Sequence, residues 1–164
     1  MPPRYLSLLL LLAFALTGGC TYTIAPPTAM PEAQLNPHGV IFTAEQAAAS
    51  LRAIGGNITD TWTPSNAAIA QFEAALPTFL QSAHNDWLRP DPPIWERVPE
   101  YKRQYLGIVE AGEEIIYANF FCKSLNESWH EQLVTVMDGG DCYFQLKYNP
   151  ATGEFFDFSV NGEA

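Results

Sequence analysis

Hydrophobic and polar positions divide the chain into three parts. Residues 6–16 are almost continuously apolar and follow a single basic residue, Arg4. About ten apolar residues are too few for a helix that crosses the roughly 30 Å hydrocarbon core, but this length is typical of the hydrophobic region of a secretory signal. Residues 20–39 contain four prolines among small polar residues, without hydrophobic periodicity. Such a composition favours an extended tether, and we expect one folded domain over residues 40–164.

The first half of this domain has helical periodicity. Thr43 and Gln46 form a capping-box pattern, and Gly55 follows the apolar positions as a stop signal. Pro64 suits the first turn of a second helix, where its missing N–H costs nothing. Pro77 interrupts that second helix and predicts a kink or a break. The apolar positions at helical spacing are Ala47, Leu51 and Ile54 in the first helix, and Ile69, Phe72, Leu76, Phe79 and Leu80 in the second.

The second half has the pattern of strands joined by tight turns. Phe144, Leu146 and Tyr148 alternate with polar neighbours, which is the period of two expected of a strand. Helices followed by antiparallel strands predict an α+β domain, with two helices packed on one face of a roughly five-stranded antiparallel β-meander. This order is similar to that of cystatin-like folds. The predicted strands are residues 104–109, 114–122, 133–137, 142–148 and 154–160.

A short motif closes the N-terminal apolar run. Thr17-Gly-Gly-Cys20 resembles the lipobox of bacterial lipoproteins, although Thr17 occupies the position where leucine is usual. The resemblance implies a signal peptide over residues 1–19, cleavage before Cys20, and a diacylglycerol on the Cys20 thiol. Lipid chains on Cys20 would attach the protein to a membrane and place the domain in the bacterial cell envelope, facing the periplasm or the exterior. The alternative is an ordinary signal peptide that leaves Cys20 as a free thiol.

Four segments of the C-terminal part are similar to a signature of uncharacterised bacterial exported lipoproteins. That family has no established activity, so the resemblance supports the domain and its cysteine pair and implies no function. It covers roughly the last 65 residues. The segments are Tyr101-Lys-Arg-Gln-Tyr105, Asn119-Phe-Phe-Cys122, Asp138-Gly-Gly-Asp-Cys-Tyr-Phe144 and Asn161-Gly-Glu-Ala164.

Charge and cysteine content restrict the classes of partner and the compartment. Removal of residues 1–19 takes away only one charged residue, a basic one, and leaves 7 basic and 18 acidic residues, a net charge of −11. This balance argues against nucleic acid as a partner. With Cys20 lipidated, Cys122 and Cys142 remain as a pair, which predicts a disulfide in an oxidising compartment. The alternative is a reactive thiol with His130 as its base.

Candidate chemistry is sparse, and the sequence leaves open whether the protein is an enzyme. His130 and Glu131 begin an HExxH pattern that lacks its second histidine, and no metal or cofactor is expected. Asp138 and Asp141 could offer oxygen atoms to calcium, but tight turns use aspartate for backbone reasons alone. Carboxylate pairs for a hydrolase acting on cell-wall or glycan material could come from Glu113, Glu114, Asp138 or Asp157.

Aromatic residues are abundant, and we expect Trp62, Trp95, Trp129 and Tyr143 to be the most exposed because they lie near turns or on a polar strand face. An exposed aromatic surface would suit peptide or glycan binding, whereas the alternative is that these side chains fill the core. The leading hypothesis is a lipid-anchored envelope protein with a non-catalytic domain that binds a protein or peptide or has a structural role. The alternatives are the periplasmic or surface hydrolase and a cystatin-like protease inhibitor.

Overall fold

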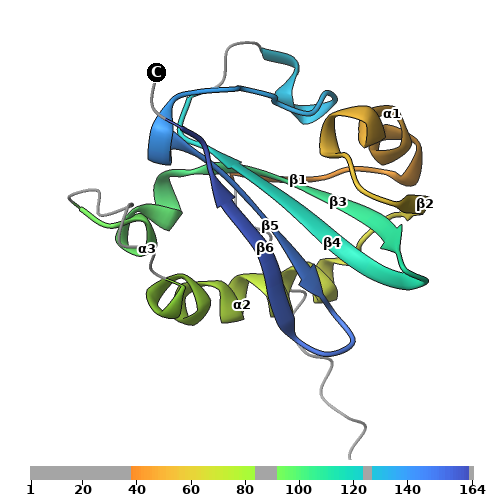
Figure 1. Ribbon diagram of the computed structural model, residues 1–164. Helices are drawn as coiled ribbons and strands as arrows, with labels where there is room; N and C mark the ends of the chain where they lie inside the picture. The colour runs from red at the N-terminus through yellow and green to blue at the C-terminus, as the bar shows by residue number, and fades with distance from the viewer. Residues whose placement is uncertain (1–37, 84–91, 124–126, 163–164) are drawn as a thin grey trace, which may run out of the picture. The chain divides into compact units, whose positions relative to one another are not determined.

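The computed structural model describes residues 38–83, 92–123 and 127–162, which form an α+β domain, as predicted (Figure 1). The predicted signal peptide, Cys20 and all but the end of the predicted tether lie outside the described residues. The strands are β1 (Gly39–Ile41), β2 (Ile58–Trp62), β3 (Lys102–Glu110), β4 (Glu113–Phe121), β5 (Tyr143–Asn149) and β6 (Glu154–Val160). The helices are α1 (Ala44–Ile54), α2 (Asn66–Ser82) and α3 (Ile94–Arg97), with short 3-10 helices η1 (Val98–Glu100), η2 (Glu127–His130) and η3 (Gly140–Cys142).

Local hydrogen bonds explain where the two longer helices begin. At α1 the predicted capping box is present: Gln46 N–H donates to Thr43 Oγ1 over 3.3 Å, and Thr43 N–H donates to Gln46 Oε1 over 2.9 Å. At α2 the cap is Ser65, whose Oγ accepts from Ala68 N–H, so this helix begins slightly later than Pro64. The sequence predicted a kink or a break at Pro77; helix α2 continues through Pro77 as one element, so it does not break there.

The sheet is mixed and has one more strand than predicted. Strands β3, β4, β5 and β6 follow one another as antiparallel neighbours, which confirms most of the meander. Two short strands share the outer edge of β3: β1 runs parallel to it and β2 antiparallel to it. The prediction of a purely antiparallel sheet was therefore wrong. These strands were missed because β1 has three residues and β2 is mostly polar.

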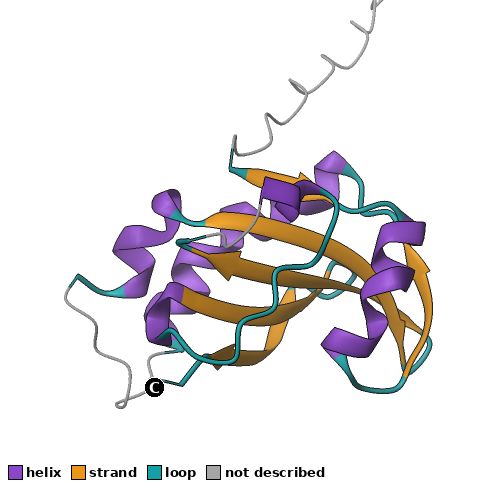
Figure 2. Ribbon diagram, turned by 90° about the horizontal axis from the view of Figure 1, so that it is seen from above, coloured by secondary structure: helices purple, strands orange, loops and turns teal. Residues whose placement is uncertain are grey.

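Helices cover both faces of the sheet, not one face as predicted. Successive strand residues point to opposite faces, so Tyr105 and Leu106 belong to different cores. Helix α2 packs on the Tyr105 face, where Phe72 lies 5.5 Å from the Tyr105 ring and 6.3 Å from the Phe120 ring. Helix α1 packs over Leu106 through Ala47. Figures 1 and 2 show α1 and α2 on opposite sides of the sheet.

Residues 133–137 do not form the predicted strand. Strand β4 pairs directly with β5, from Ile116 opposite Tyr148 to Phe121 opposite Tyr143, and no place is left between them. The chain between these strands instead crosses one face of the sheet. We call residues 127–139 the strap. Since β4 and β5 are already joined, the strap needs other partners for its backbone, and the side chains of the sheet provide them.

Candidate functional site

The sheet face opposite α2 is only partly covered, and we call it the open face. It carries the side chains of Leu106, Tyr117, Asn119 and Lys147, which alternate with residues of the main core along their strands. Helix α1 covers the part of this face around Leu106, and Leu133 of the strap packs beside it. The remaining side chains divide into two groups, an amide row beneath the strap and a charged cluster around Lys147.

The amide row consists of Gln104 on β3, Asn119 on β4, Gln145 on β5 and Asn161 after β6. Gln104 and Asn119 are buried, yet each amide has partners. Asn119 Nδ2 donates to Gln104 Oε1 over 2.9 Å. Gln145 Nε2 donates to Asn119 Oδ1 over 3.4 Å and to Asn161 Oδ1 over 3.3 Å. The four side chains therefore form one continuous hydrogen-bonded network across the sheet.

This amide row holds the backbone of the strap. Gln104 Nε2 donates to the carbonyl of Gln132 over 2.8 Å, and Gln104 Oε1 accepts from Val134 N–H over 2.9 Å. Asn119 Nδ2 donates to the carbonyl of Val134 over 2.9 Å. Further along, Asn161 Nδ2 donates to the carbonyls of residues 136 and 138. Carbonyls of alternate residues point the same way in an extended chain. The amide row therefore forms its hydrogen bonds with backbone groups along one side of the strap.

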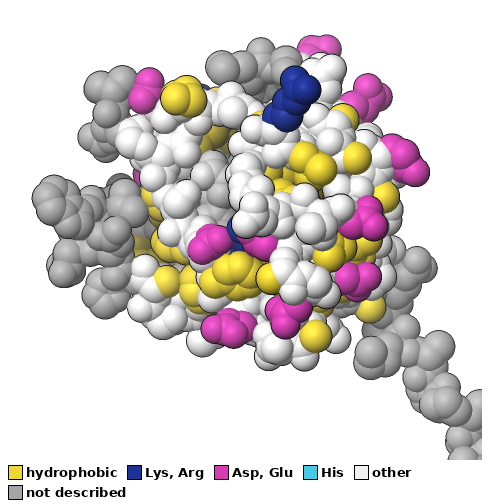
Figure 3. Space-filling view, turned by 45° about the vertical axis from the view of Figure 1, so that its right-hand side comes forward, with side chains coloured by type: hydrophobic (Ala, Val, Ile, Leu, Met, Phe, Trp, Pro, Cys, Tyr) yellow, Lys and Arg dark blue, Asp and Glu magenta, His cyan; other side chains and the backbone are white. Residues whose placement is uncertain are grey.

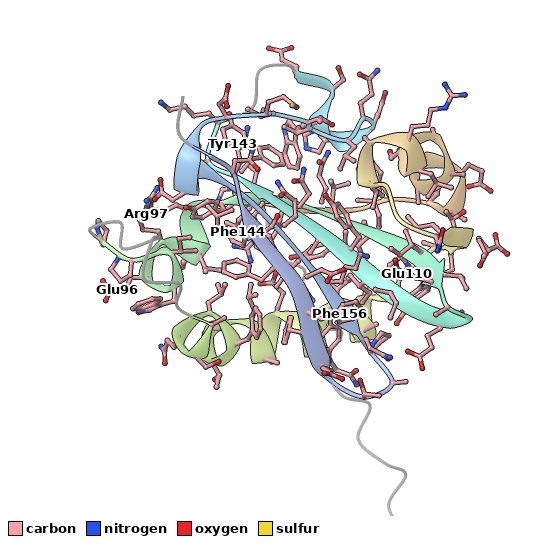
Figure 4. The ribbon with its side chains drawn as sticks, in the orientation of Figure 1. Glu96, Arg97, Glu110, Tyr143, Phe144 and Phe156 are labelled. Atoms are coloured by element: carbon pink, nitrogen blue, oxygen red, sulfur yellow. A yellow bond between two sulfur atoms is a disulfide. The ribbon has the colours of Figure 1, made fainter. Side chains whose placement is uncertain are left out.

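The charged group, which we call the Lys147 cluster, lies beside the amide row. Lys147 Nζ is 2.6 Å from Glu110 Oε2 and 3.0 Å from Asp157 Oδ2, and it lies 5.9 Å from the centre of the Phe156 ring. Only 11% of the Lys147 side chain is exposed. A bulge in β6 positions Asp157, whose φ of 50° is uncommon for a residue other than glycine. Figure 4 shows Glu110 near the β3–β4 turn and Phe156 on β6.

Two titratable groups of the open face, Lys147 and Tyr117, have raised pKa values. Burial alone would lower the pKa of Lys147, but the hydrogen bonds and charges of Glu110 and Asp157 outweigh burial and raise it. Lys147 therefore stays protonated and cannot serve as a general base or a Schiff-base lysine at neutral pH. Tyr117 pairs with Lys147 across the strands, and burial raises the pKa of its hydroxyl to about 12. Acidic side chains lie among hydrophobic ones on the surface drawn in Figure 3.

The opposite face holds a buried ion pair that sequence reasoning missed. Arg103 is fully buried and lies 2.5 Å from Glu73 Oε2 of α2, while its guanidinium also donates to the carbonyl of Val98. The hydroxyl of Tyr105 donates to the same carboxylate. Burial and the charge of Glu73 raise the pKa of Tyr105. The sequence gives little signal for this pair, because Lys102 and Gln104 flank Arg103 and the strand begins with three polar residues.

The predicted cysteine pair comes together at one end of the sheet. Cys122 and Cys142 lie at disulfide distance, with their Cα atoms 5.1 Å apart. Beside them Arg97 of α3 pairs with Asp141, whose backbone carbonyl accepts from the Tyr101 hydroxyl over 2.7 Å. Burial raises the pKa of Tyr101 to about 12, although the charge of Arg97 opposes the change. The Asp141 carboxylate is thus engaged by a guanidinium and not directed at a cation site.

The carboxylates considered for catalysis are not gathered into one site. Glu113 and Glu114 are successive residues of β4 and point to opposite faces. Glu113 accepts a hydrogen bond from Asn149, Asp157 pairs with Lys147, and Asp138 belongs to the strap. His130 stacks on Trp129, with ring centres 3.7 Å apart. Within the described ranges, no three His, Cys, Asp or Glu side chains are placed to hold a metal ion.

The expected exposure of four aromatic residues was largely wrong. Trp129 and Tyr143 are buried, at 8% and 7% exposure, because they form a core cluster with Phe121 against which Val134 and Val136 of the strap pack. Trp62 and Trp95 are partly buried against the main core, and Trp62 Nε1 donates to the carbonyl of Ile108 over 3.1 Å. The alternative reading, that large aromatics fill the core, describes these residues better.

Comparison with known proteins finds no family model, curated protein or solved structure that matches this chain. Among the described residues, no helix is both long and apolar enough to cross a membrane.

Proposed function

We propose that this protein is a lipid-anchored component of the bacterial cell envelope whose domain binds a protein or peptide partner without catalysing a reaction. In this proposal, residues 1–19 are removed and lipid on Cys20 attaches the protein to the membrane. Residues 20–39 then separate the domain from the lipid surface. The compartment is oxidising, which is compatible with a disulfide between Cys122 and Cys142.

The observation that carries the binding function is the Lys147 cluster. Its charged groups are fixed on strands, ion-paired, and set beside the aromatic side chains of Tyr117 and Phe156. A rigid arrangement of donors, acceptors and aromatic surface suits recognition. General acid–base catalysis instead needs a group whose pKa lies near the working pH, and a protonated lysine held by Glu110 and Asp157 does not meet that need.

Site-specific photocrosslinking in cells tests this proposal. A photoreactive benzoylphenylalanine replaces Phe156 on the open face, and in a matched control it replaces Gln71, an exposed residue of α2. We expect a discrete protein adduct from position 156 that is absent from position 71. Crosslinking from neither position, or turnover of a cell-wall or glycan substrate by the purified chain that is lost in E110Q or D157N, would contradict a non-catalytic binding role.

A further inference from the structure

The strap is held in the manner of a bound peptide. Among the described residues, no backbone-to-backbone hydrogen bond involves residues 133–138. Their backbone partners are the side-chain amides of Gln104, Asn119 and Asn161, which contact the carbonyls of alternate strap residues and the N–H of Val134. Recognition through main-chain groups of an extended segment is the basis of strand-type peptide binding. In this case side-chain amides take the place of an edge strand.

The amide row belongs to the sheet and not to the strap. Three of its residues come from the central strands β3, β4 and β5 and one from the segment after β6, and those strands pair with one another without any contribution from the strap. Removing the strap would therefore break no hydrogen bond of the sheet. It would leave the buried side-chain amides of Gln104 and Asn119 without their acceptors in the strap, which is costly unless another polar chain replaces the strap.

The strap itself is the less firmly held of the two parts. Val134 and Val136 are only partly buried against Phe121 and Tyr143, and Met137 is 86% exposed. Trp129 at the start of the strap is buried beside Phe121, but residues 133–139 make few buried apolar contacts, which is a feature of a segment that opens at low free-energy cost. The strap lies between Cys122 and Cys142 in the sequence, and these two residues lie at disulfide distance.

We infer that the amide row is a binding site for an extended polypeptide, and that the strap occupies it as an exchangeable internal ligand. The external ligand is a partner's extended segment with small β-branched residues at two alternate positions, as Val134 and Val136 are in the strap. This inference deepens the proposed binding function. It uses a different part of the open face from the Lys147 cluster. An experiment can therefore contradict peptide binding by the amide row without contradicting partner binding at the Lys147 cluster, and the reverse also holds.

A synthetic peptide with the sequence of residues 127–139 and a fluorescent label tests the inference. The full mature chain carrying V134P loses the N–H that donates to Gln104, which weakens its own strap and leaves the amide row unchanged. We expect V134P to bind the peptide at least about tenfold more tightly than the unaltered chain, because the internal competitor is weakened. Adding N119A to V134P should reduce peptide affinity about tenfold or more.

N-methylated peptides provide a matched control that leaves the protein unaltered apart from V134P. Methylation at the position of Val134 blocks the N–H that Gln104 accepts, and methylation at Val136 blocks an N–H that contacts no amide of the row. We expect the first to weaken binding about tenfold and the second by less than about threefold. Equal loss from both peptides would overturn recognition by the amide row.

Hydrogen exchange on the unaltered chain keeps the inference testable if V134P does not fold. Saturating peptide should speed exchange of the backbone amides of residues 133–137 at least about tenfold and leave those of β3, β4 and β5 unchanged. No peptide binding to a folded V134P chain whose strap amides exchange freely would overturn the inference. A V134P strap that stays as protected as the original would also overturn it, since the backbone would then not be what is recognised.

Discussion

Asn119 donates a hydrogen bond from its side-chain amide to the side-chain oxygen of Gln104 on the neighbouring strand, over 2.9 Å. The same nitrogen also donates to the carbonyl of Val134 in the strap. Two buried polar residues in central strands thus form a hydrogen bond with each other, and one of them also forms a hydrogen bond with the backbone of the strap. Such networks stabilise a fold only when every member has a partner, so this pair links the sheet to the segment that crosses it.

Replacement of Asn119 by alanine should destabilise the domain. The change removes the two hydrogen bonds that Asn119 Nδ2 donates and leaves the carbonyl of Val134 without a partner. We expect the free energy of unfolding to fall by about 2–3 kcal/mol. Chemical denaturation of the mature chain measures this value. Thr135→Ala, at an exposed strap position, should change it by less than about 0.5 kcal/mol. An equally small effect of N119A would mean that the amide row does not hold the strap.

The cysteine pair should be oxidised in the compartment that we propose for this protein. Because Cys122 and Cys142 are 20 positions apart, the C122S/C142S variant should lose about 3 kcal/mol of unfolding free energy in the chain-entropy model. Thiol labelling of the protein, unfolded without reductant, should modify neither residue. The single variant C20S provides the control and should leave domain stability unchanged. Labelling at both positions would refute the bridge.

Tyr117 should make the domain sensitive to alkaline pH. Burial raises the pKa of its hydroxyl from 10.0 to about 12, so between these values the folded state retains a proton that the unfolded state releases. The stabilisation is complete below about pH 10, falls as the pH rises from 10 to 12, and is lost above that range. In Tyr117→Phe, the fall in unfolding free energy between pH 10 and 12 should be smaller by up to about 2–3 kcal/mol. Unfolding free energies measured at several pH values give this difference. A pH profile identical to that of the unaltered chain would contradict the assignment.

Glu73 should be required to neutralise Arg103. Glu73→Gln leaves a fully buried guanidinium without its carboxylate, and we expect a loss of about 3 kcal/mol in the free energy of unfolding. Glu114→Gln, at an exposed position on β4, should have an effect below about 0.5 kcal/mol. Equal effects of the two substitutions would show that the ion pair contributes little to stability.

Local patterns predicted the elements that depend on local interactions. The capping box of Thr43 and Gln46, the hairpin between β3 and β4, and the meeting of Cys122 with Cys142 all agree with the structure. The likeness to cystatin-like folds is not confirmed, because helices lie on both faces and β1 is parallel to β3. The side of the sheet on which a helix packs is a tertiary property that its own periodicity does not reveal.

The strap explains the main errors at the candidate site. The run Leu133 to Met137 is apolar except for Thr135 and predicted a strand, but such a pattern does not indicate the partner of the backbone. The polar side chains of Gln104 and Asn119 within apolar strands were the available signal, since buried amides need partners. Trp129 was expected at the surface because its position near a turn does not reveal that its side chain packs against Phe121 of the sheet.

The proposed envelope location depends on the proposed lipid anchor at Cys20, and mass spectrometry of the protein extracted from membranes tests this anchor most directly. We expect the N-terminal residue of the mature chain to be Cys20, with the added mass of a diacylglycerol on its sulfur. A chain that still begins at Met1, carries no lipid and is recovered with Cys122 and Cys142 as free thiols would contradict the export, the anchor and the oxidising compartment together.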